Sequence, residues 1–373
     1  MENAAFLPYG RQLIDEDDIQ AVMAVCQSDW LTTGPRVALF EQAVCEYSGA
    51  SYGVAVNSGT AALHAALHAL GVTAGDEVIV PAMTFAATSN SVLYCGAKPV
   101  FADVSVDTLL IDIESVEANI TPMTKAIIAV DYAGQPCDWD ALKHLAKKYR
   151  LYLVADSCHA IGAVYKGQKV GTLADITVFS FHPVKHITTG EGGMAVTNNK
   201  VLADKMRAFR SHGIAADTHQ REKENAWFYE MTELGFNYRL TDIQCALGIS
   251  QLEKLDQWLE RRNELAQLYF SKLENRCAIP LACSSDVTNA YHLFVVRTKD
   301  RDDRFLQMRK SNIGVNVHYI PVYLHPYYQS LGYAKGLCPN AEEAYAEIIS
   351  LPMWVGMHES DIDRVVRFFD EKS

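Results

Sequence analysis

Residues 52–196 alternate short apolar, β-branched runs with amphipathic stretches, and this rhythm constrains the fold more than any other feature of the chain. It is typical of an α/β layered domain, in which helices cover a sheet. The apolar runs predict strands at residues 77–80, 99–103, 126–130, 151–155, 176–180 and 194–197. The spacing of leucines predicts covering helices at residues 60–70 and 139–149. Ligands of such sheets gather at the carboxyl ends of the strands, so residues just after each strand are the first candidates for a site.

A different pattern begins near residue 241. Residues 241–273 carry leucines three and four positions apart, which predicts a long helix that bridges to a second domain. Shorter apolar runs and one predicted helix beyond it favour a small α+β unit; they cover residues 292–297, 315–319 and 361–369. We therefore expect a large domain at residues 1–250 and a small α+β domain at residues 251–373.

The composition excludes several functional classes. Lys and Arg number 33 against 45 Asp and Glu, which argues against a nucleic-acid or membrane partner but leaves room for a local basic pocket. Nine scattered cysteines without a Cys-x-x-Cys pair are typical of buried, reduced thiols in a cytosolic protein. The N-terminal segment lacks the basic start and apolar core of a signal peptide, and no stretch approaches the roughly 20 apolar residues of a membrane span. We expect a soluble, cytoplasmic protein.

Three short motifs that follow predicted strands carry the chemistry. The first, Asn57-Ser58-Gly59-Thr60, follows a predicted strand at residues 54–56 and opens the predicted helix at residues 60–70. Free amides at a helix start, a glycine that permits close approach and two hydroxyls form a phosphate cradle, although Ser58 or Thr60 would serve equally well as a helix cap. Neither a P-loop pattern nor Gly-x-Gly-x-x-Gly follows the first strand, which argues against a P-loop NTPase or a standard dinucleotide fold.

The other two motifs bring a carboxylate and an amine. Asp156 directly follows the predicted strand at residues 151–155, where it is either a helix N-cap or the charged partner of a ligand cation. Lys185 lies in the loop after the predicted strand at residues 176–180, and a glycine-rich return at residues 190–193 closes that loop. A desolvated lysine has a lowered pKa and can form a Schiff base, whereas a solvated surface lysine has neither property.

The order of cradle, aspartate and lysine meets the requirements of pyridoxal phosphate (PLP). The helix start would take the phosphate, the carboxylate would keep the pyridine nitrogen protonated, and the lysine would hold the aldehyde as an imine. Phe85, which follows the predicted strand at residues 77–80, is either a stacking face for the cofactor ring or an ordinary core residue.

Residues that match a known family extend over nearly the whole chain. They are Leu31-Thr32-Thr33-Gly34, Asn57-Ser58-Gly59-Thr60-Ala61-Ala62-Leu63, Pro81-Ala82-Met83-Thr84-Phe85, Val130-Asp131-Tyr132-Ala133-Gly134, Asp156-Ser157-Cys158-His159-Ala160, Ser180-Phe181-His182 to Lys185, Gly190-Glu191-Gly192-Gly193, Gly235-Phe236-Asn237-Tyr238-Arg239 and Val317-His318-Tyr319. With these motifs the chain resembles the DegT/StrS family of sugar aminotransferases. The resemblance implies a PLP-dependent enzyme of aminotransferase fold type I, like aspartate aminotransferase, with a large mixed-sheet α/β domain and a small α+β domain.

The family pattern also implies roles for individual residues. The cofactor contacts would be Phe85, Asp156, His159, Lys185 and Asn237, with Gly59, Thr60 and Ser180 on the phosphate. The catalytic residues would be Lys185, which forms the Schiff base, Asp156, which pairs with the pyridinium nitrogen, and His159, near the phenolic oxygen. Asn237 would reach a phosphate in the neighbouring subunit's site, so complete sites would require a homodimer. Substrate contacts would fall on Tyr9, Asp29, Trp30, Leu31, Thr32, Gly59, Ser180, Asn237, Val317, His318 and Tyr319, for which ordinary loop and sheet packing is the alternative.

Within the family, four features look most like the pseudaminic acid pathway enzymes that aminate C4 of a UDP-linked 4-keto-6-deoxy sugar. They are Asp131-Tyr132-Ala133-Gly134, His159, Phe209-Arg210-Ser211-His212-Gly213 and His318-Tyr319-Ile320-Pro321-Val322-Tyr323. The substrate implied is a UDP-4-keto-6-deoxy-N-acetylhexosamine, the L-arabino-hexulose that gives UDP-4-amino-4,6-dideoxy-β-L-AltNAc, with glutamate as amino donor. Relatives that act on UDP-4-keto-6-deoxy-GlcNAc or on other nucleotide-linked keto sugars share most of the cofactor motifs and remain alternatives.

Three other activities are weighed against this one. Sugar dehydratases of this fold place His where aminotransferases have the imine-forming Lys; here Lys185 holds that place and His186 is merely adjacent. A PLP lyase or desulfurase would require a cysteine on a mobile loop. Cys338 is a candidate for this cysteine, and the alternative is an incidental thiol. A non-catalytic, PLP-binding regulator would usually carry a DNA-binding module, and the sequence has neither a basic appendage nor spare length for one.

Overall fold

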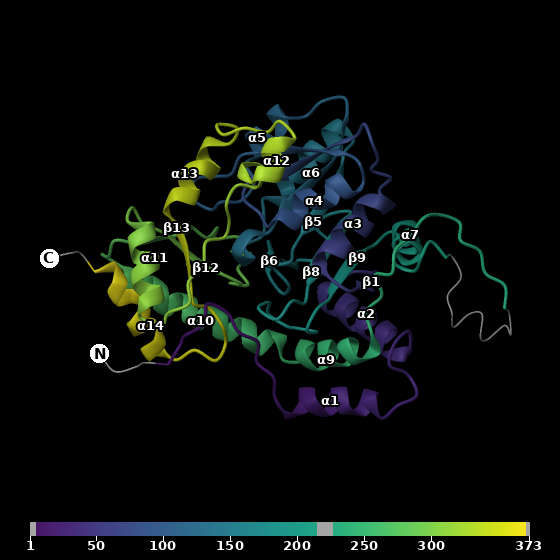
Figure 1. Cartoon of the computed structure of the whole chain (residues 1–373), viewed down its shortest axis with the longest axis horizontal. Coiled ribbons are helices and arrows are strands. Elements are labelled where there is room, and N and C mark those ends of the chain that lie inside the picture. Colours follow the sequence, from purple (N-terminus) through teal and green to yellow (C-terminus); the bar gives the residue numbers. More distant parts are fainter. Residues whose placement is uncertain (1–4, 215–226, 371–373) are drawn as a thin grey trace.

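The computed structural model describes residues 5–214 and 227–370 and is built around a seven-stranded mixed sheet (Figure 1). The strand order is β1-β9-β8-β5-β4-β2-β3. Neighbouring strands from β8 to β3 are parallel, whereas β9 runs antiparallel to both β8 and β1. The bounds are β1 Tyr52–Val56, β2 Glu77–Pro81, β3 Lys98–Ala102, β4 Thr124–Val130, β5 Tyr152–Asp156, β8 Ile176–Ser180 and β9 Gly193–Thr197.

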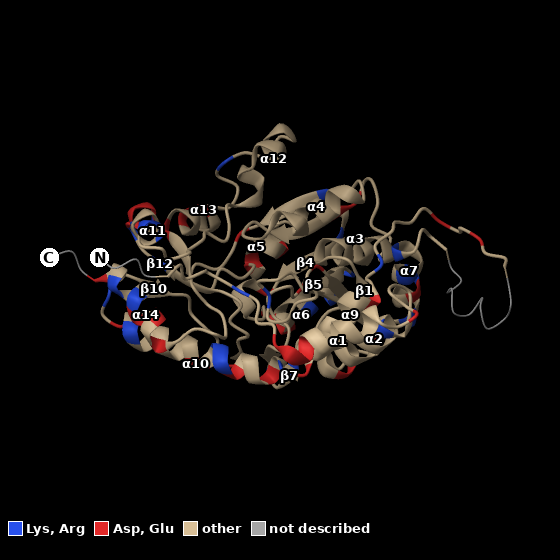
Figure 2. Ribbon diagram, turned by 60° about the horizontal axis from the view of Figure 1, so that its bottom comes forward, with Lys and Arg blue, Asp and Glu red and all other residues tan. Residues whose placement is uncertain are grey.

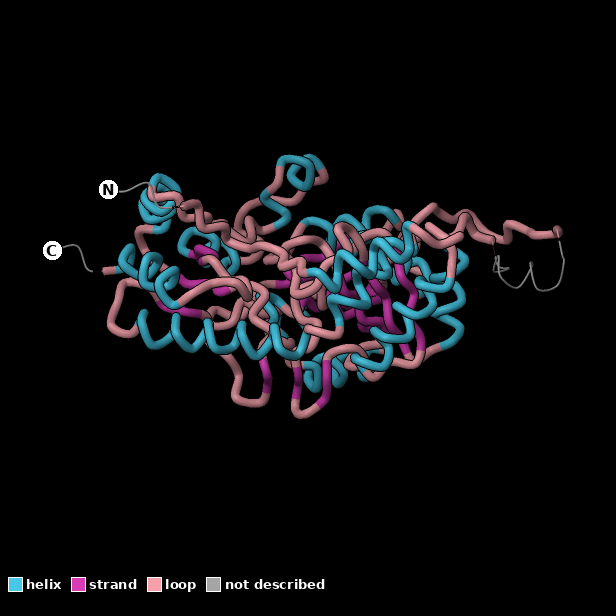
Figure 3. Tube along the Cα trace, turned by 90° about the horizontal axis from the view of Figure 1, so that it is seen from below, coloured by secondary structure: helices cyan, strands magenta, loops and turns pink. Residues whose placement is uncertain are grey.

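Helices cover both faces of this sheet because its strands are apolar on both sides. In β2, Val78 and Val80 belong to one core cluster and Ile79 to another, and all three are fully buried. The first cluster is completed by α3 Gly59–Ala69, α4 Ala86–Tyr94 and α7 Lys200–Arg210, and the second by α2 Pro35–Ser48, α6 Trp139–Tyr149 and α9 Asp242–Leu252. Figure 3 shows the strands lying between helices.

A second core forms around a three-stranded antiparallel sheet of order β10-β12-β13. Its elements are β10 Ile279–Pro280, β12 Phe294–Arg297, β13 Ile348–Leu351, α10 Leu255–Leu273, α11 Arg301–Lys310 and α14 Glu359–Val366. Tyr269 of α10 stacks on Phe294 of β12 with ring centroids 4.7 Å apart, which fixes the helix against the small sheet. Basic and acidic residues are interspersed along α10 and α14 (Figure 2).

Short elements complete the described chain. They are α1 Glu16–Cys26, α5 Ile113–Ala118, α12 Pro326–Ser330, α13 Pro339–Glu347, the 3₁₀ turns Tyr132–Gly134, Val322–Leu324 and Arg367–Phe369, and a small sheet of β6 Val164–Tyr165, β7 Gln168–Lys169 and β11 Val287–Thr288. Helix α1 packs along α9, beneath it in Figure 1. The N-terminal segment therefore lies against the start of the connection between the two larger sheets.

Most predicted elements occur within two residues of their expected bounds, and β8 and α6 match them fully. The long helix predicted at residues 241–273 is wrong: the chain breaks at Glu253 and Lys254 between α9 and α10. The break lets α9 pack against α1 and α2 while α10 continues to the small sheet, and it turns Lys254 toward the acidic side chains of α1. The predicted helix at residues 361–369 begins earlier, as α14, and ends in a 3₁₀ turn.

The apolar run at residues 315–319 does not form a strand. It makes a single bridge, Asn316 with Ser350, and the Asn316 side chain accepts the backbone N–H of Val317 at 2.9 Å. A side chain that takes a backbone donor in this way competes with sheet pairing. The run at residues 292–297 is a strand only from Phe294 onward.

The cysteines correct one expectation. All nine are free, but the expectation of uniformly buried thiols is wrong, because Cys26, Cys277 and Cys283 are exposed and Cys95 and Cys158 are partly buried.

Among the described helices, none combines the length and apolar character that crossing a membrane requires.

Candidate active site

The carboxyl ends of β5 and β8 place three of the predicted residues at one edge of the sheet. The two strands pair in parallel, so Asp156 at the end of β5 and Ser180 at the end of β8 lie at the same edge. Lys185 lies in the loop from β8 to β9, which is closed by a backbone hydrogen bond from Thr189 N–H to the carbonyl of Phe181 at 3.0 Å. The expected convergence of carboxylate, hydroxyl and amine is present.

The start of α3 forms a close-packed turn against the end of β8. Ser58 is the N-cap and its hydroxyl accepts the Ala61 N–H at 3.1 Å, so the capping alternative holds for this serine. A Cβ atom on Gly59 would lie 3.0 Å from Sγ of Cys158 and 3.1 Å from Cβ of Ser180. Such contacts are tighter than most that a Cβ atom makes, so a glycine favours the close approach of the helix start to these residues. The result is a helix N-terminus with a hydroxyl beside it, a geometry suited to an anion such as phosphate.

The carboxylate of Asp156 is buried and held by two donors. Its Oδ2 accepts the hydroxyl of Thr88 at 2.7 Å, and its Oδ1 accepts the backbone N–H of Cys158 at 3.3 Å. The chain turns after β5 without starting a helix, so Asp156 is not a helix N-cap. The N-cap alternative is therefore wrong, and the role of Asp156 as the charged partner of a ligand cation stays a prediction.

The amine of Lys185 lies among buried side chains from four parts of the chain. Burial lowers its pKa to about 8, while the nearby Cys158 and Asp156 act in the opposite direction. A lysine with a lowered pKa has a larger neutral, nucleophilic fraction near neutral pH than a surface lysine. Its Nζ lies 3.4 Å from Nε2 of His292, a buried residue that follows strand β11.

Aromatic side chains stand around the same edge. The hydroxyl of Tyr319 lies 3.2 Å from Nε2 of His159, and the rings of Phe85 and Tyr319 are 6.0 Å apart. Phe85 is 61% exposed, so its alternative as a core residue is wrong and its ring is free to cover a ligand. On the other side, the ring of Tyr9 lies 5.6 Å from that of His318.

An N-terminal arm, residues 7–14, holds Tyr9 over this edge. The backbone of the arm pairs with the small domain, through Gly314 N–H to the Leu7 carbonyl and Met353 N–H to the Tyr9 carbonyl. A Cβ on Gly10 would lie 3.5 Å from Cβ of Val184, so the arm runs directly beside the residue that precedes Lys185.

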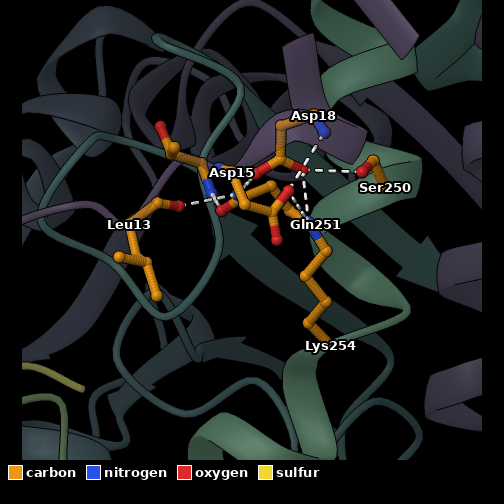
Figure 4. Close-up of polar contacts among 7 residues, drawn as sticks. Leu13, Asp15, Asp18, Ser250, Gln251 and Lys254 are labelled. Atoms are coloured by element: carbon orange, nitrogen blue, oxygen red, sulfur yellow. Dashed lines mark hydrogen bonds and ion pairs between the residues drawn. The ribbon is translucent and has the colours of Figure 1, made fainter. Parts of the chain in front are cut away.

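Gln251 joins this arm to the lysine loop (Figure 4). Its side-chain amide donates to the Leu13 carbonyl at 2.9 Å and to Oδ2 of Asp18 at 2.6 Å, while its oxygen accepts the Thr188 N–H at 3.3 Å. Asp18 is itself buried and also accepts from Ser250 at 2.6 Å and from Lys254 at 3.0 Å. Its three side-chain donors compensate the burial of the carboxylate.

Several predicted residues lie away from Lys185 in the single chain. Asp29, Trp30, Leu31 and Thr32 occupy the exposed segment between α1 and α2, which is tied to α9 by the Asp242 N–H to Leu31 carbonyl bond at 3.0 Å. Asn237 is exposed and bridges to Ser211. Val317 is partly buried and packs on the main core, as its packing alternative expected.

Two residues of the site were not among the predicted ones. Thr88 binds Asp156 from 68 positions away, and His292 reaches Lys185 from 107 positions away. Thr88 stands three positions after Phe85, in the first turn of α4, and nothing in its spacing distinguishes it from a helix-surface threonine. His292 begins an apolar run that predicts only a strand.

Comparisons with known proteins agree with this geometry. The chain matches the DegT/DnrJ/EryC1/StrS aminotransferase family over residues 12–370. It is 43% identical over 375 residues to the uncharacterized protein MJ1066 of Methanocaldococcus jannaschii, covering 98% of this chain and 97% of that one. Among solved structures, the PLP form of the putative sugar aminotransferase Spr1654 from Streptococcus pneumoniae is 33% identical, with 98% of each chain covered and a TM-score of 0.93. PseC of Helicobacter pylori, an aminotransferase involved in pseudoaminic acid biosynthesis, is 34% identical, with 98% of each chain covered and a TM-score of 0.91.

Proposed function

This chain belongs to the DegT/DnrJ/EryC1/StrS aminotransferase family and is a PLP-dependent sugar aminotransferase; from this premise we propose that it adds an amine to C4 of a UDP-linked 4-keto-6-deoxy-N-acetylhexosamine. The observation that carries the proposal is the convergence of Lys185, Asp156 and the Gly59 turn at one edge of the sheet. Glutamate is the proposed amino donor.

The side chains and backbone at this edge fit PLP. Gly59, Thr60 and Ser180 would hold the phosphate, because the start of α3 packs closely against Ser180 and a helix N-terminus offers free backbone N–H groups to an anion. Asp156 would face the pyridine nitrogen, Phe85 would cover the ring and Lys185 would bind the aldehyde carbon. When bound, PLP supplies a carbonyl that takes up an amino group and a ring that accepts electrons from the reacting carbon.

The residues of the chain would then divide the work. Nζ of Lys185 would remove a proton from the donor and return one to the sugar carbon, a task suited to a pKa near 8. The carboxylate of Asp156, fixed by Thr88, would keep a positive charge opposite it through both halves of the reaction. His159, fixed by Tyr319, would donate to or accept from an oxygen on the ring side that it faces.

The sugar specificity rests on sequence. The segments at residues 131–134, 209–213 and 318–323, together with His159, are the features that look most like pseudaminic acid pathway enzymes. PseC is 34% identical over 98% of both chains. Tyr9 and His318 stand together beside the lysine loop, where a sugar ring bound at Lys185 would meet them. The alternatives are UDP-4-keto-6-deoxy-GlcNAc and other nucleotide-linked keto sugars.

A homodimer with shared sites is part of the proposal. Asn237 is exposed in the single chain, and it follows a segment in which Trp227, Met231 and Leu234 expose 86%, 64% and 76% of their surfaces. Apolar side chains gathered in this way mark an interface. A second copy would cover them and would bring Asn237 to the phosphate of its neighbour.

The environment of Cys338 argues against the lyase and desulfurase alternative. Cys338 is buried at the start of α13, within 3.9 Å of the Phe101 carbonyl, and does not stand on an open loop. Burial also raises the pKa of this thiol to about 12, so it is not a ready nucleophile.

The test is a panel of 4-keto sugar nucleotides offered with glutamate, with the products identified by NMR. We expect a 4-amino sugar from the UDP-linked 4-keto-6-deoxy-L-arabino substrate, formed much faster than from its UDP-4-keto-6-deoxy-GlcNAc epimer. The reverse preference would assign the alternative substrate, and release of sulfide from cysteine would place the enzyme in another class.

A further inference from the structure

Four buried histidines surround the amine of Lys185, and one of them touches it. They are His159, His186, His292 and His318. Nε2 of His292 lies 3.4 Å from Nζ of Lys185, whereas Nε2 of His186 is bound to the Ala290 carbonyl at 2.9 Å and Nε2 of His159 lies 3.2 Å from the Tyr319 hydroxyl. His292 is therefore the histidine whose ring nitrogen is directed at the reacting amine.

The position of His292 is fixed by the backbone around it. The guanidinium of Arg262 donates to the Tyr291 carbonyl at 3.0 Å, and the Leu293 N–H donates to the Ala133 carbonyl at 3.2 Å. The His292 ring packs against that of His159, with centroids 4.4 Å apart. Its other nitrogen, Nδ1, is buried without a partner in the described residues. A buried imidazole with a single polar neighbour makes its one hydrogen bond through that neighbour.

We propose that Nε2 of His292 accepts a hydrogen bond from the protonated amine of Lys185 and so holds the proton-bearing lysine in place between the two halves of the reaction. Nδ1 then carries the ring hydrogen. This inference rests on the proposed function of Lys185 as the group that moves the proton, and it adds a second residue to that task.

The charges around the pair support a neutral imidazole. Burial lowers the pKa of His292 well below its usual value, and the Lys185 charge adds to that effect. The titratable groups facing the pair come from every neighbouring element: Asp156, Cys158 and His159 after β5, His186 on the lysine loop, Arg262 on α10, and His318 and Tyr319 near the arm. A neutral acceptor stabilises the charged lysine, so its loss lowers the pKa of Lys185.

The test measures the Lys185 amine directly, in the full chain freed of cofactor and without any sugar. Trace labelling with acetic anhydride over pH 6–10, followed by peptide mass spectrometry, gives the pKa of Lys185 as the midpoint of its labelling rate. In His292→Phe we expect this midpoint to fall by about one unit, which makes labelling at pH 7 about fivefold faster. His292→Gln supplies an amide oxygen as the acceptor, so its midpoint should return most of the way to that of the unchanged chain.

The matched control is His64→Gln. His64 is also a buried histidine, but its partner is the Tyr238 hydroxyl at 3.1 Å, so the midpoint should stay at the unchanged-chain value. An unchanged or raised midpoint in folded His292→Phe overturns the proposal. If the midpoints shift as expected but the unchanged chain aminates none of the sugars, the result would count against the proposed function alone.

If His292→Phe does not fold, ¹⁵N NMR of the histidine-labelled chain decides the matter. The Nδ1–H tautomer with a bare Nε2, altered when Lys185 is replaced by Met, supports the hydrogen bond. A protonated Nε2, or a His292 signal indifferent to Lys185→Met, overturns it.

Discussion

The hydroxyl of Thr88 donates to Oδ2 of Asp156 at 2.7 Å, and the same hydroxyl lies 2.7 Å from that of Thr84. All three side chains are buried. A threonine pair, Thr84 on the loop after β2 and Thr88 in the first turn of α4, therefore fixes the orientation of a carboxylate on β5. The orientation of the Asp156 carboxylate is thus set by this pair as well as by its own strand.

Replacing Asp156 by Asn should slow transamination by about 10²–10³-fold, because the amide no longer stabilises a positive ring nitrogen. Thr88→Val should cost about tenfold, since a hydrogen bond to a charged group is lost while the carboxylate remains. Single-turnover rates with glutamate measure both. The control, Thr108→Val, changes a threonine elsewhere in the chain. An equal loss of rate in this control would show that the Thr88 effect is general destabilisation.

The hydrogen bonds of Gln251 to the arm and to the lysine loop predict that a change at this residue affects both segments. Gln251→Ala leaves Asp18 and the Leu13 carbonyl each short of a donor, so the free energy of unfolding should fall by about 1–3 kcal/mol. The KM for the sugar should rise more than kcat falls, because the arm carrying Tyr9 loosens. Gln42→Ala removes an exposed glutamine that bonds Glu46 and serves as the control. A change in stability with KM unaffected would separate the arm from substrate binding.

The sequence predicted the candidate reacting residues better than the residues that hold them in place. Asp156 ends β5 and Lys185 lies in the loop that follows β8, and short apolar, β-branched runs place strand ends well. Thr88 and His292 were missed because they meet their partners across 68 and 107 residues, a distance over which no local pattern carries information. The break between α9 and α10 was missed for a related reason: the leucine spacing continues through Lys254, and only its tertiary ion pairs with Asp15 and Asp18 mark the bend.

The buried histidines predict a pH dependence of stability. Burial lowers the pKa of His64 to about 4 and that of His318 to about 3, against about 6.5 in the unfolded chain. Below pH 6.5 the unfolded chain binds protons that the folded chain does not, so the free energy of unfolding falls as the pH falls toward 4. In His64→Gln this slope should be shallower by up to about 1.4 kcal/mol per pH unit. Urea unfolding from pH 4.5 to 7 measures it, and parallel slopes for the two proteins would refute the assignment.

Asn237 provides a test of the shared site. Mixing Lys185→Ala chains with Asn237→Ala chains creates dimers in which one site has both wild-type residues. If sites are shared, a one-to-one mixture should recover about a quarter of the wild-type activity, because half of the dimers are mixed and each has one complete site. Differently tagged chains confirm that mixed dimers form. Mixed dimers without recovered activity would place Asn237 in the site of its own chain.

The central claim is that the amine of Lys185 is covalently joined to PLP in the resting enzyme. Borohydride reduction of the loaded protein, followed by peptide mapping, tests it most directly. We expect the reduced cofactor on the peptide that contains Lys185 and nowhere else, and no label in Lys185→Ala. A fully loaded protein whose label lies on another lysine, or on none, would contradict the account.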